Sequence, residues 1–148
     1  MEAASNHPRE VGTLALRSTL FDMERLPPWI DGIAQKLGLT EQLTFAIQLC
    51  MEEDVSNVIR HSYAGDDGQW VTVRCAPSQD GHVVFTIEDN ATPFDPLQGS
   101  EPPAIGPEDN GQLGGQGIRL LRQFADTLEY ESKPGCNRLH IGFLQQSS

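Results

Sequence analysis

Residues 40–62 read TEQLTFAIQLCMEEDVSNVIRHS, and this stretch decides the fold. Apolar residues recur in it every three or four positions, which is the spacing of one buried helical face. Those positions are Leu43, Ile47, Cys50, Met51, Val55, Val58 and Ile59. Thr40 can cap the first turn with its side-chain oxygen, and residues 64–68 (AGDDG) are turn formers. The pattern therefore predicts one long helix from Glu41 to about Ser62.

Strand and helix patterns lie on both sides of this predicted helix. Upstream, Gly12–Thr19 alternates apolar and polar residues like a half-buried strand. Met23–Leu39 then shows helical spacing, with the helix expected to begin near its pair of prolines. Downstream, Trp70–Ala76 and His82–Glu88 have strand patterns and are separated by a short turn-forming segment. Such a pair predicts an antiparallel hairpin.

The C-terminal part of the chain combines a long loop with a second hairpin. Residues 91–114 hold five of the ten prolines and show little periodicity, so we expect a functional or mobile loop. Helical spacing returns over Gly115–Asp126, and Thr127–Glu131 with Arg138–Leu144 have hairpin patterns. The order β-α-α-β-β-loop-α-β-β predicts an α+β fold. We expect a two-layer α/β sandwich, with a mixed, mostly antiparallel sheet covered on one face by helices.

Length and charge limit the kind of protein. The 148 residues suit a single domain, expected over residues 11–148 after a disordered head at residues 1–10. Ten basic against 21 acidic residues give a net charge of 10 − 21 = −11, which opposes direct binding to nucleic acid. A basic protein partner and a merely solvated acidic surface are both compatible with this charge.

Two further features point to the cytoplasm. No apolar run approaches the ~20 residues of a membrane span, and the first residues lack the apolar core of a signal peptide, so no membrane association is expected. Cys50, Cys75 and Cys136 are odd in number and widely spaced. They are therefore expected to be packed thiols rather than a disulfide or a metal site.

The predicted long helix carries the first candidate site. Glu53, Asn57 and His61 follow one another at intervals of four residues and share one helical face, with Arg60 beside it. An asparagine oxygen suits Mg²⁺, and a carboxylate one turn earlier can act as a general base. Read in isolation, the same pattern also describes a solvated polar face, and a histidine near a helix end can simply bind late carbonyl groups.

The second and third candidates lie further along the chain. Asp89 follows an apolar strand, where its carboxylate can accept a hydrogen bond from an exocyclic amine such as that of adenine, or can simply end the strand. Residues 110–119 (NGQLGGQGIR) form a glycine-rich entry to a helix, a place where backbone amides bind phosphate or where a hinge bends. The stretch is neither a Walker A loop nor a dinucleotide fingerprint, because Leu120 occupies the third glycine position.

In this order the three segments resemble the nucleotide-binding domain of the GHKL (Bergerat-fold) ATPase superfamily. Residues 53–63 (EDVSNVIRHSY) resemble the N-box of anti-sigma-factor serine-protein kinases of the partner-switching type. Asp89 with residues 93–96 (PFDP) resembles their adenine box, and residues 114–121 (GGQGIRLL) resemble their phosphate loop. The resemblance covers about residues 10–145.

The resemblance implies a role for individual residues. Glu53 would be the general base, Asn57 the Mg²⁺ ligand, Asp89 the adenine contact, and residues 95–113 the lid over ATP. The implied nucleotide-binding residues are Asn57, Arg60, Asp89, Ala91, Phe94, Gly111, Gly114, Gly115, Gly117 and Ile118. Arg60 and Arg119 are equally compatible with phosphate contact and with solvation. Ala91 stands where the family commonly has glycine, which puts close approach of the purine in question.

The resemblance also implies an activity. We expect an ATP- and Mg²⁺-dependent serine/threonine-protein kinase and anti-sigma factor that phosphorylates a serine of a STAS-domain anti-anti-sigma protein. Family members also bind a sigma factor and are commonly homodimers. A catalytically weak nucleotide- or partner-binding module, an activator kinase of a phosphatase, and the detached ATPase domain of a histidine kinase are the alternatives.

Overall fold

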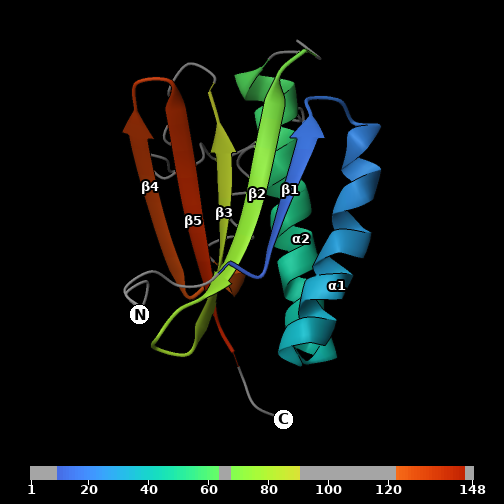
Figure 1. Ribbon diagram of the computed structural model, residues 1–148, viewed down its shortest axis with the longest axis vertical. Coiled ribbons are helices and arrows are strands. Elements are labelled where there is room, and N and C mark those ends of the chain that lie inside the picture. The colour runs from blue at the N-terminus through green and yellow to red at the C-terminus, as the bar shows by residue number, and fades with distance from the viewer. Residues whose placement is uncertain (1–9, 64–67, 91–122, 146–148) are drawn as a thin grey trace, which may run out of the picture.

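The computed structural model describes residues 10–63, 68–90 and 123–145. Five strands form one sheet in the order β1-β2-β3-β5-β4, and every pairing among them is antiparallel (Figure 1). The strands are β1 Gly12–Arg17, β2 Trp70–Pro77, β3 His82–Asp89, β4 Thr127–Lys133 and β5 Cys136–Leu144. The strands predicted from the sequence are confirmed to within two residues at each end. The predicted loop 91–114, most of the predicted helix 115–126 and the predicted head lie outside the described residues.

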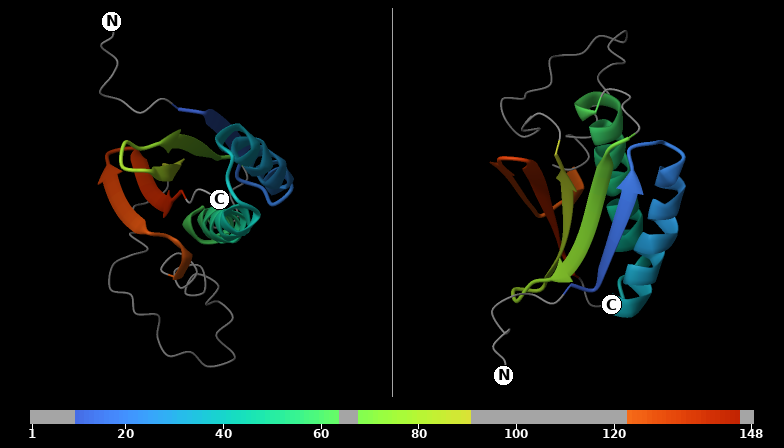
Figure 2. Two further views of the ribbon diagram at one scale, coloured as in Figure 1. Left: turned by 90° about the horizontal axis from the view of Figure 1, so that it is seen from below. Right: turned by 45° about the horizontal axis from the view of Figure 1, so that its top comes forward.

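Two helices cover one face of the sheet, as Figures 1 and 2 show. The helical elements are a 3₁₀ turn η2 Asp22–Arg25, α1 Leu26–Leu37, α2 Glu41–Asn57 and a π turn η3 Val58–Ser62. The two prolines at the start of α1 occupy its first positions, where a missing N–H costs nothing. The expected two-layer α+β sandwich is confirmed.

The long helix begins and ends where the sequence predicts. The hydroxyl oxygen of Thr40 accepts a hydrogen bond from the amide of Leu43 at 3.1 Å, which confirms the predicted cap. The last turn differs from a regular helix, because the amide of Tyr63 bonds to the carbonyl oxygen of Val58, five residues earlier, at 2.9 Å. Such π turns are rare and concentrate at functional sites.

The core lies between the sheet and the helices. Alternate residues of the central strands point inward, and the ring of Phe85 meets the rings of Trp29 and Phe143 edge-on at centroid distances of 6.1 and 6.2 Å. Cys50 and Cys75 are buried thiols that form no disulfide with a described residue, and burial raises the pKa of each to about 12. These two cysteines are therefore packed thiols, as expected. Among the described helices, none is long and apolar enough to cross a membrane.

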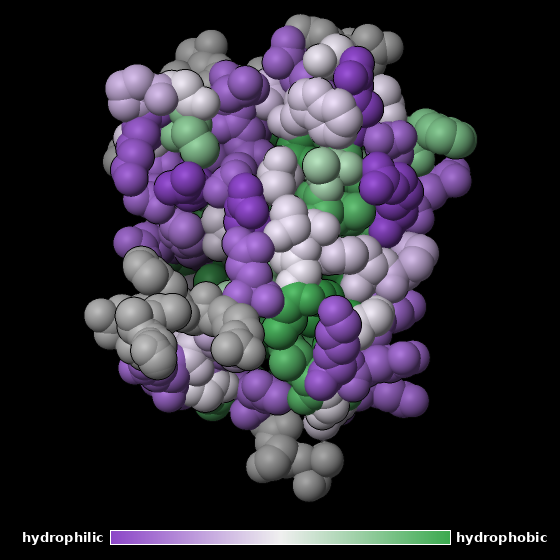
Figure 3. All heavy atoms as spheres, in the orientation of Figure 1, coloured by the Kyte–Doolittle hydropathy of each residue, from purple (hydrophilic) through white to green (hydrophobic). Residues whose placement is uncertain are grey.

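The opposite face of the sheet is open and largely hydrophilic, as Figure 3 shows. Glu88 on β3 lies between two guanidinium groups, with Arg74 at 3.3 Å and Arg138 at 2.8 Å. Burial raises the pKa of Glu88, but the hydrogen bonds from these arginines outweigh it and the net shift is downward. A charged ladder of this kind suits a sheet face that is not part of the core.

Candidate nucleotide site

Two side-chain oxygen atoms near the end of α2 are buried. Oε1 of Glu53 and Oδ1 of Asn57 are inaccessible to solvent, and neither has a hydrogen-bond partner among the residues that the structure describes. The two residues are one helical turn apart and therefore share a face of α2. Burying an acceptor without a partner costs about 1–3 kcal/mol, so such atoms call for a ligand.

Another acidic side chain on this helix, that of Asp54, was not identified as a site residue by the sequence interpretation. Asp54 is only 5% exposed, and burial, with a smaller contribution from the nearby carboxylate of Asp89, raises its pKa to about 7. The run of three acids at residues 52–54 is typical of a solvated surface, so the burial of Asp54 is not apparent from composition. The signal that identifies it is spacing, because Asp54 lies four residues after Cys50 and four before Val58, both of which are buried.

Asp89 is the last residue of β3 and occupies an inward-facing position. It is paired in register with Asn137 on β5, and the amide Nδ2 of Asn137 donates a hydrogen bond to Oδ1 of Asp89 at 3.0 Å. Asn137 is 3% exposed, and its Oδ1 accepts a hydrogen bond from Ser132 at 2.8 Å. The carboxylate is therefore oriented by the neighbouring strand, and its charge contributes to the raised pKa of Asp54 on α2.

Asn137 is a second residue that the sequence interpretation did not identify as part of a site. It occupies an inward position of β5, whose other inward residues, Leu139, Ile141 and Phe143, are apolar. A single polar residue in an otherwise apolar alternation is the signal that could have found it, because such a group needs a specific partner.

Only part of the predicted site falls within the described residues. The structure places Glu53 and Asn57 on α2 and Asp89 at the end of β3, and Arg60 is exposed on the π turn. The predicted contacts Ala91, Phe94, Gly111, Gly114, Gly115, Gly117 and Ile118 lie outside the described residues, as do Arg119 and the side chain of His61.

The oxygen atoms of the described site residues are chemically suited to Mg²⁺ and adenine, the two groups that the sequence implies. The amide oxygen of Asn57, which has no donor among the described residues, is a suitable Mg²⁺ ligand, because this ion takes one or two protein oxygens and completes its shell with water and phosphate. A carboxylate at a strand end, oriented by Asn137, is a suitable acceptor for a hydrogen bond from an amine.

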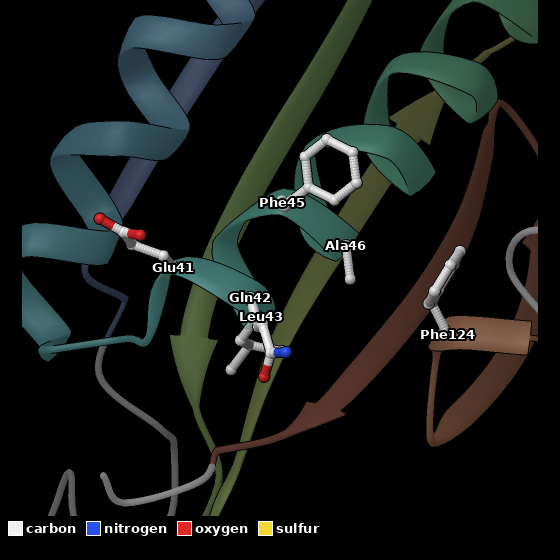
Figure 4. Close-up of a pocket in the computed structure, with 6 residues that line it drawn as sticks. All are labelled: Glu41, Gln42, Leu43, Phe45, Ala46 and Phe124. Atoms are coloured by element: carbon white, nitrogen blue, oxygen red, sulfur yellow. The ribbon is translucent and has the colours of Figure 1, made fainter.

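A separate apolar hollow of about 540 Å³ lies at the other end of α2 (Figure 4). Its lining is Glu41, Gln42, Leu43, Phe45, Ala46 and Phe124. Phe45 is 64% exposed, and Glu41 points away from Phe124 in the close-up. Of the predicted site residues that the structure describes, namely Glu53, Asn57, Arg60 and Asp89, none lines this hollow, so the described part of the candidate site lies elsewhere on the molecule.

Comparison with known proteins gives the class. Residues 17–143 match the model of the histidine kinase-like ATPase domain, and the chain belongs to this family. Serine/threonine-protein kinase BtrW of Bordetella bronchiseptica is 31% identical over 113 residues, 76% of this chain and 79% of that protein. Anti-sigma F factor of Clostridium perfringens is 29% identical over 101 residues, 68% of this chain and 71% of that protein.

Within the family, the similarity is to serine/threonine-protein kinases and anti-sigma factors, which confirms the kinase class expected from the sequence. A solved structure agrees on the fold. A chain of the SiaB-SiaC complex from Pseudomonas aeruginosa superposes with a TM-score of 0.67 at 14% identity, over 95% of this chain and 93% of that one.

Proposed function

We propose that this chain binds Mg²⁺ and ATP between α2 and the end of β3 and transfers the γ-phosphoryl group to a serine of a STAS-domain anti-anti-sigma protein. In this proposal the unphosphorylated partner competes with a sigma factor for the kinase, which acts as a homodimer in the cytoplasm. One observation carries the proposal: the buried oxygens of Glu53 and Asn57 are aligned on one helical face with no donor among the described residues.

Each described residue has a separate task in this reaction. The carboxylate of Glu53 accepts the proton of the serine hydroxyl as the serine oxygen bonds to the γ-phosphorus and the bond to the departing ADP oxygen breaks. Oδ1 of Asn57 would hold the metal, and the carboxylate of Asp89 would accept a hydrogen bond from the exocyclic amine of adenine. When bound, Mg²⁺ supplies the positive charge that the acidic chain lacks. Phosphoryl transfer needs mainly this positioning and charge neutralisation.

The direct test is a transfer assay with purified candidate STAS proteins and ATP labelled in the γ position. We expect label to appear on one serine of a cognate partner, and to disappear when EDTA removes the metal. Saturable binding of ATP without transfer to any STAS protein encoded near this gene would contradict the kinase role and favour a partner-binding module.

Replacing Asn57 by alanine is expected to remove the effect of Mg²⁺ on ATP affinity, because it deletes the proposed protein ligand of the metal. Calorimetric titrations with ATP, with and without Mg²⁺, measure this difference for the wild type and for Asn57→Ala. Gln42→Ala removes an exposed amide from the same helix and serves as the control. A variant at Asn57 that keeps the full response to Mg²⁺ would exclude this residue as the ligand.

Replacing Asp89 by asparagine is expected to weaken ATP binding by roughly 10- to 100-fold, the value of a hydrogen bond to a charged group. Inosine triphosphate carries an oxygen in place of the exocyclic amine, so its weaker binding should change much less. Competition titrations with both nucleotides test the assignment. An equal loss for the two nucleotides would show that Asp89 supports the fold rather than adenine recognition.

A further inference from the structure

The hydroxyl of Tyr63 joins the ends of two strands. Tyr63 is 7% exposed and follows the π turn directly. Its hydroxyl oxygen lies 2.8 Å from the carbonyl oxygen of Trp70 and 2.7 Å from Oδ1 of Asn90, and it accepts a hydrogen bond from the amide of Asn90 at 3.0 Å. Because a hydroxyl has one proton, it donates to one of the two oxygens at a time while it accepts from the amide.

These contacts fall at the point where the β2–β3 ladder ends. Thr72 is opposite Glu88, so the same register places Trp70 opposite Asn90. The hydroxyl of Tyr63 therefore bridges a carbonyl oxygen on one strand and an amide on its neighbour. The bridged amide belongs to the residue directly after Asp89, so the bridge fixes the backbone on the C-terminal side of the proposed adenine contact.

The π turn brings Tyr63 to this position. A regular helix would pair the carbonyl oxygen of Val58 with the amide of Ser62, but the wider turn pairs it with the amide of Tyr63. Val58 and Tyr63 are both buried, at 8% and 7% exposure, so the wider turn returns the chain to the sheet-facing side of the helix. The helix α2 continues directly into this π turn and carries Asn57 and Glu53, which lie six and ten residues before Tyr63.

Asp89 is thus held from two directions. Asn137 on β5 binds its carboxylate, and Tyr63 fixes the backbone that follows it. We propose that Tyr63 is a positioning residue for adenine recognition, with the π turn coupling the helix that carries the proposed general base and metal ligand to the strand end that carries Asp89. This inference rests on the proposed function of Asp89, and it assigns Tyr63 a role that is exerted through Asp89.

Tyr63→Phe tests the proposal, because it keeps the ring in the core and removes only the hydroxyl. The variant loses the neutral hydrogen bond that the amide of Asn90 donates to the hydroxyl, and this loss is expected to weaken Mg-ATP binding about three- to tenfold. KM for ATP should rise by a similar factor while kcat at saturating ATP stays within about twofold. Binding of inosine triphosphate, which has no exocyclic amine, should also stay within about twofold. Unchanged ATP affinity, or an equal loss for both nucleotides, would overturn the proposal.

A matched control removes a hydroxyl from β3, on the face of the sheet opposite the helices. Thr86 on β3 faces the open side of the sheet, where its Oγ1 lies 2.9 Å from Nδ1 of His140. Thr86→Val should leave both nucleotide affinities unchanged. If Tyr63→Phe does not fold, Asn90→Ala removes one partner of the hydroxyl at an exposed position and should weaken ATP binding about two- to threefold. Unchanged ATP binding in that variant would overturn the proposal in the same way.

A double-mutant cycle separates this inference from a structural role. If Tyr63 acts through Asp89, Tyr63→Phe should have little further effect on ATP affinity in an Asp89→Asn background. Additive losses would mean that the hydroxyl acts elsewhere and would contradict the proposal. Wild-type protein that binds no Mg-ATP would instead contradict the proposed function itself, so the two failures give different results.

Discussion

Replacing Glu53 by glutamine is expected to lower the rate of serine phosphorylation by at least about 100-fold while ATP affinity stays within about threefold. General-base catalysis contributes roughly 10²–10⁴ to a rate, and the amide of glutamine cannot take the proton of a serine hydroxyl. The amide keeps the size of the side chain and leaves Asn57 and Asp89 in place. Single-turnover transfer from labelled ATP, together with calorimetric titration of ATP, measures the two quantities separately.

The neighbouring glutamate provides a close control for this experiment. Glu52 is exposed on the same helix and loses the same charge in Glu52→Gln. We expect that variant to transfer phosphate at the wild-type rate. Comparable transfer by Glu53→Gln and the wild type would mean that the buried carboxylate serves binding or folding and that another group, or none, takes the proton.

Asp54→Asn is expected to change how stability depends on pH. The ordinary pKa of this carboxyl is 3.8 and burial raises it to about 7 in the folded chain, so between these values the folded state holds a proton that the unfolded state has released. The contribution of Asp54 to the free energy of unfolding is therefore fully present below pH 4 and is lost as the pH rises toward 7. From pH 5 to pH 8 the loss amounts to roughly 2–3 kcal/mol, at about 1.4 kcal/mol per unit of pKa difference.

Asparagine cannot titrate, so the variant should lack this loss. Urea unfolding at several pH values between 5 and 8 gives the free energy of unfolding of both proteins, and the difference between the two curves isolates the group from all others. Between pH 5 and pH 8, the free energy of unfolding of Asp54→Asn should therefore rise relative to that of the wild type by the same roughly 2–3 kcal/mol. Glu52→Gln should follow the wild-type curve, and a constant offset between Asp54→Asn and the wild type would show that Asp54 does not titrate in this range.

The elements that the sequence predicts well are those set by local chemistry. The spacing of apolar residues on α2, the side-chain cap at Thr40 and the alternation along β2, β3 and β5 each act within a few residues, so they appear in the sequence. The acid and amide of the candidate site share a helical face for the same reason, since residues four apart lie one above the other.

The partners of Asp89 could not be predicted in this way. Its contact with Asn137 joins residues 48 positions apart, and the bridge from Tyr63 to Asn90 joins residues 27 positions apart. The first contact depends on the pairing of β3 with β5. The second depends on a π turn that no residue pattern in the helix predicts. The burial of Asp54 likewise depends on what packs against α2.

By itself the sequence determined the α+β class, the order of the elements, the packed cysteines and the placement of Glu53 and Asn57 on one face, because each of these follows from the period of a helix or strand. Only the tertiary structure decided that β3 pairs with β5, that Asp54 is buried near Asp89, and that Tyr63 and Asn137 hold the end of β3. The physical reason is that pairing and desolvation depend on distances between segments remote in sequence, which the packed core fixes.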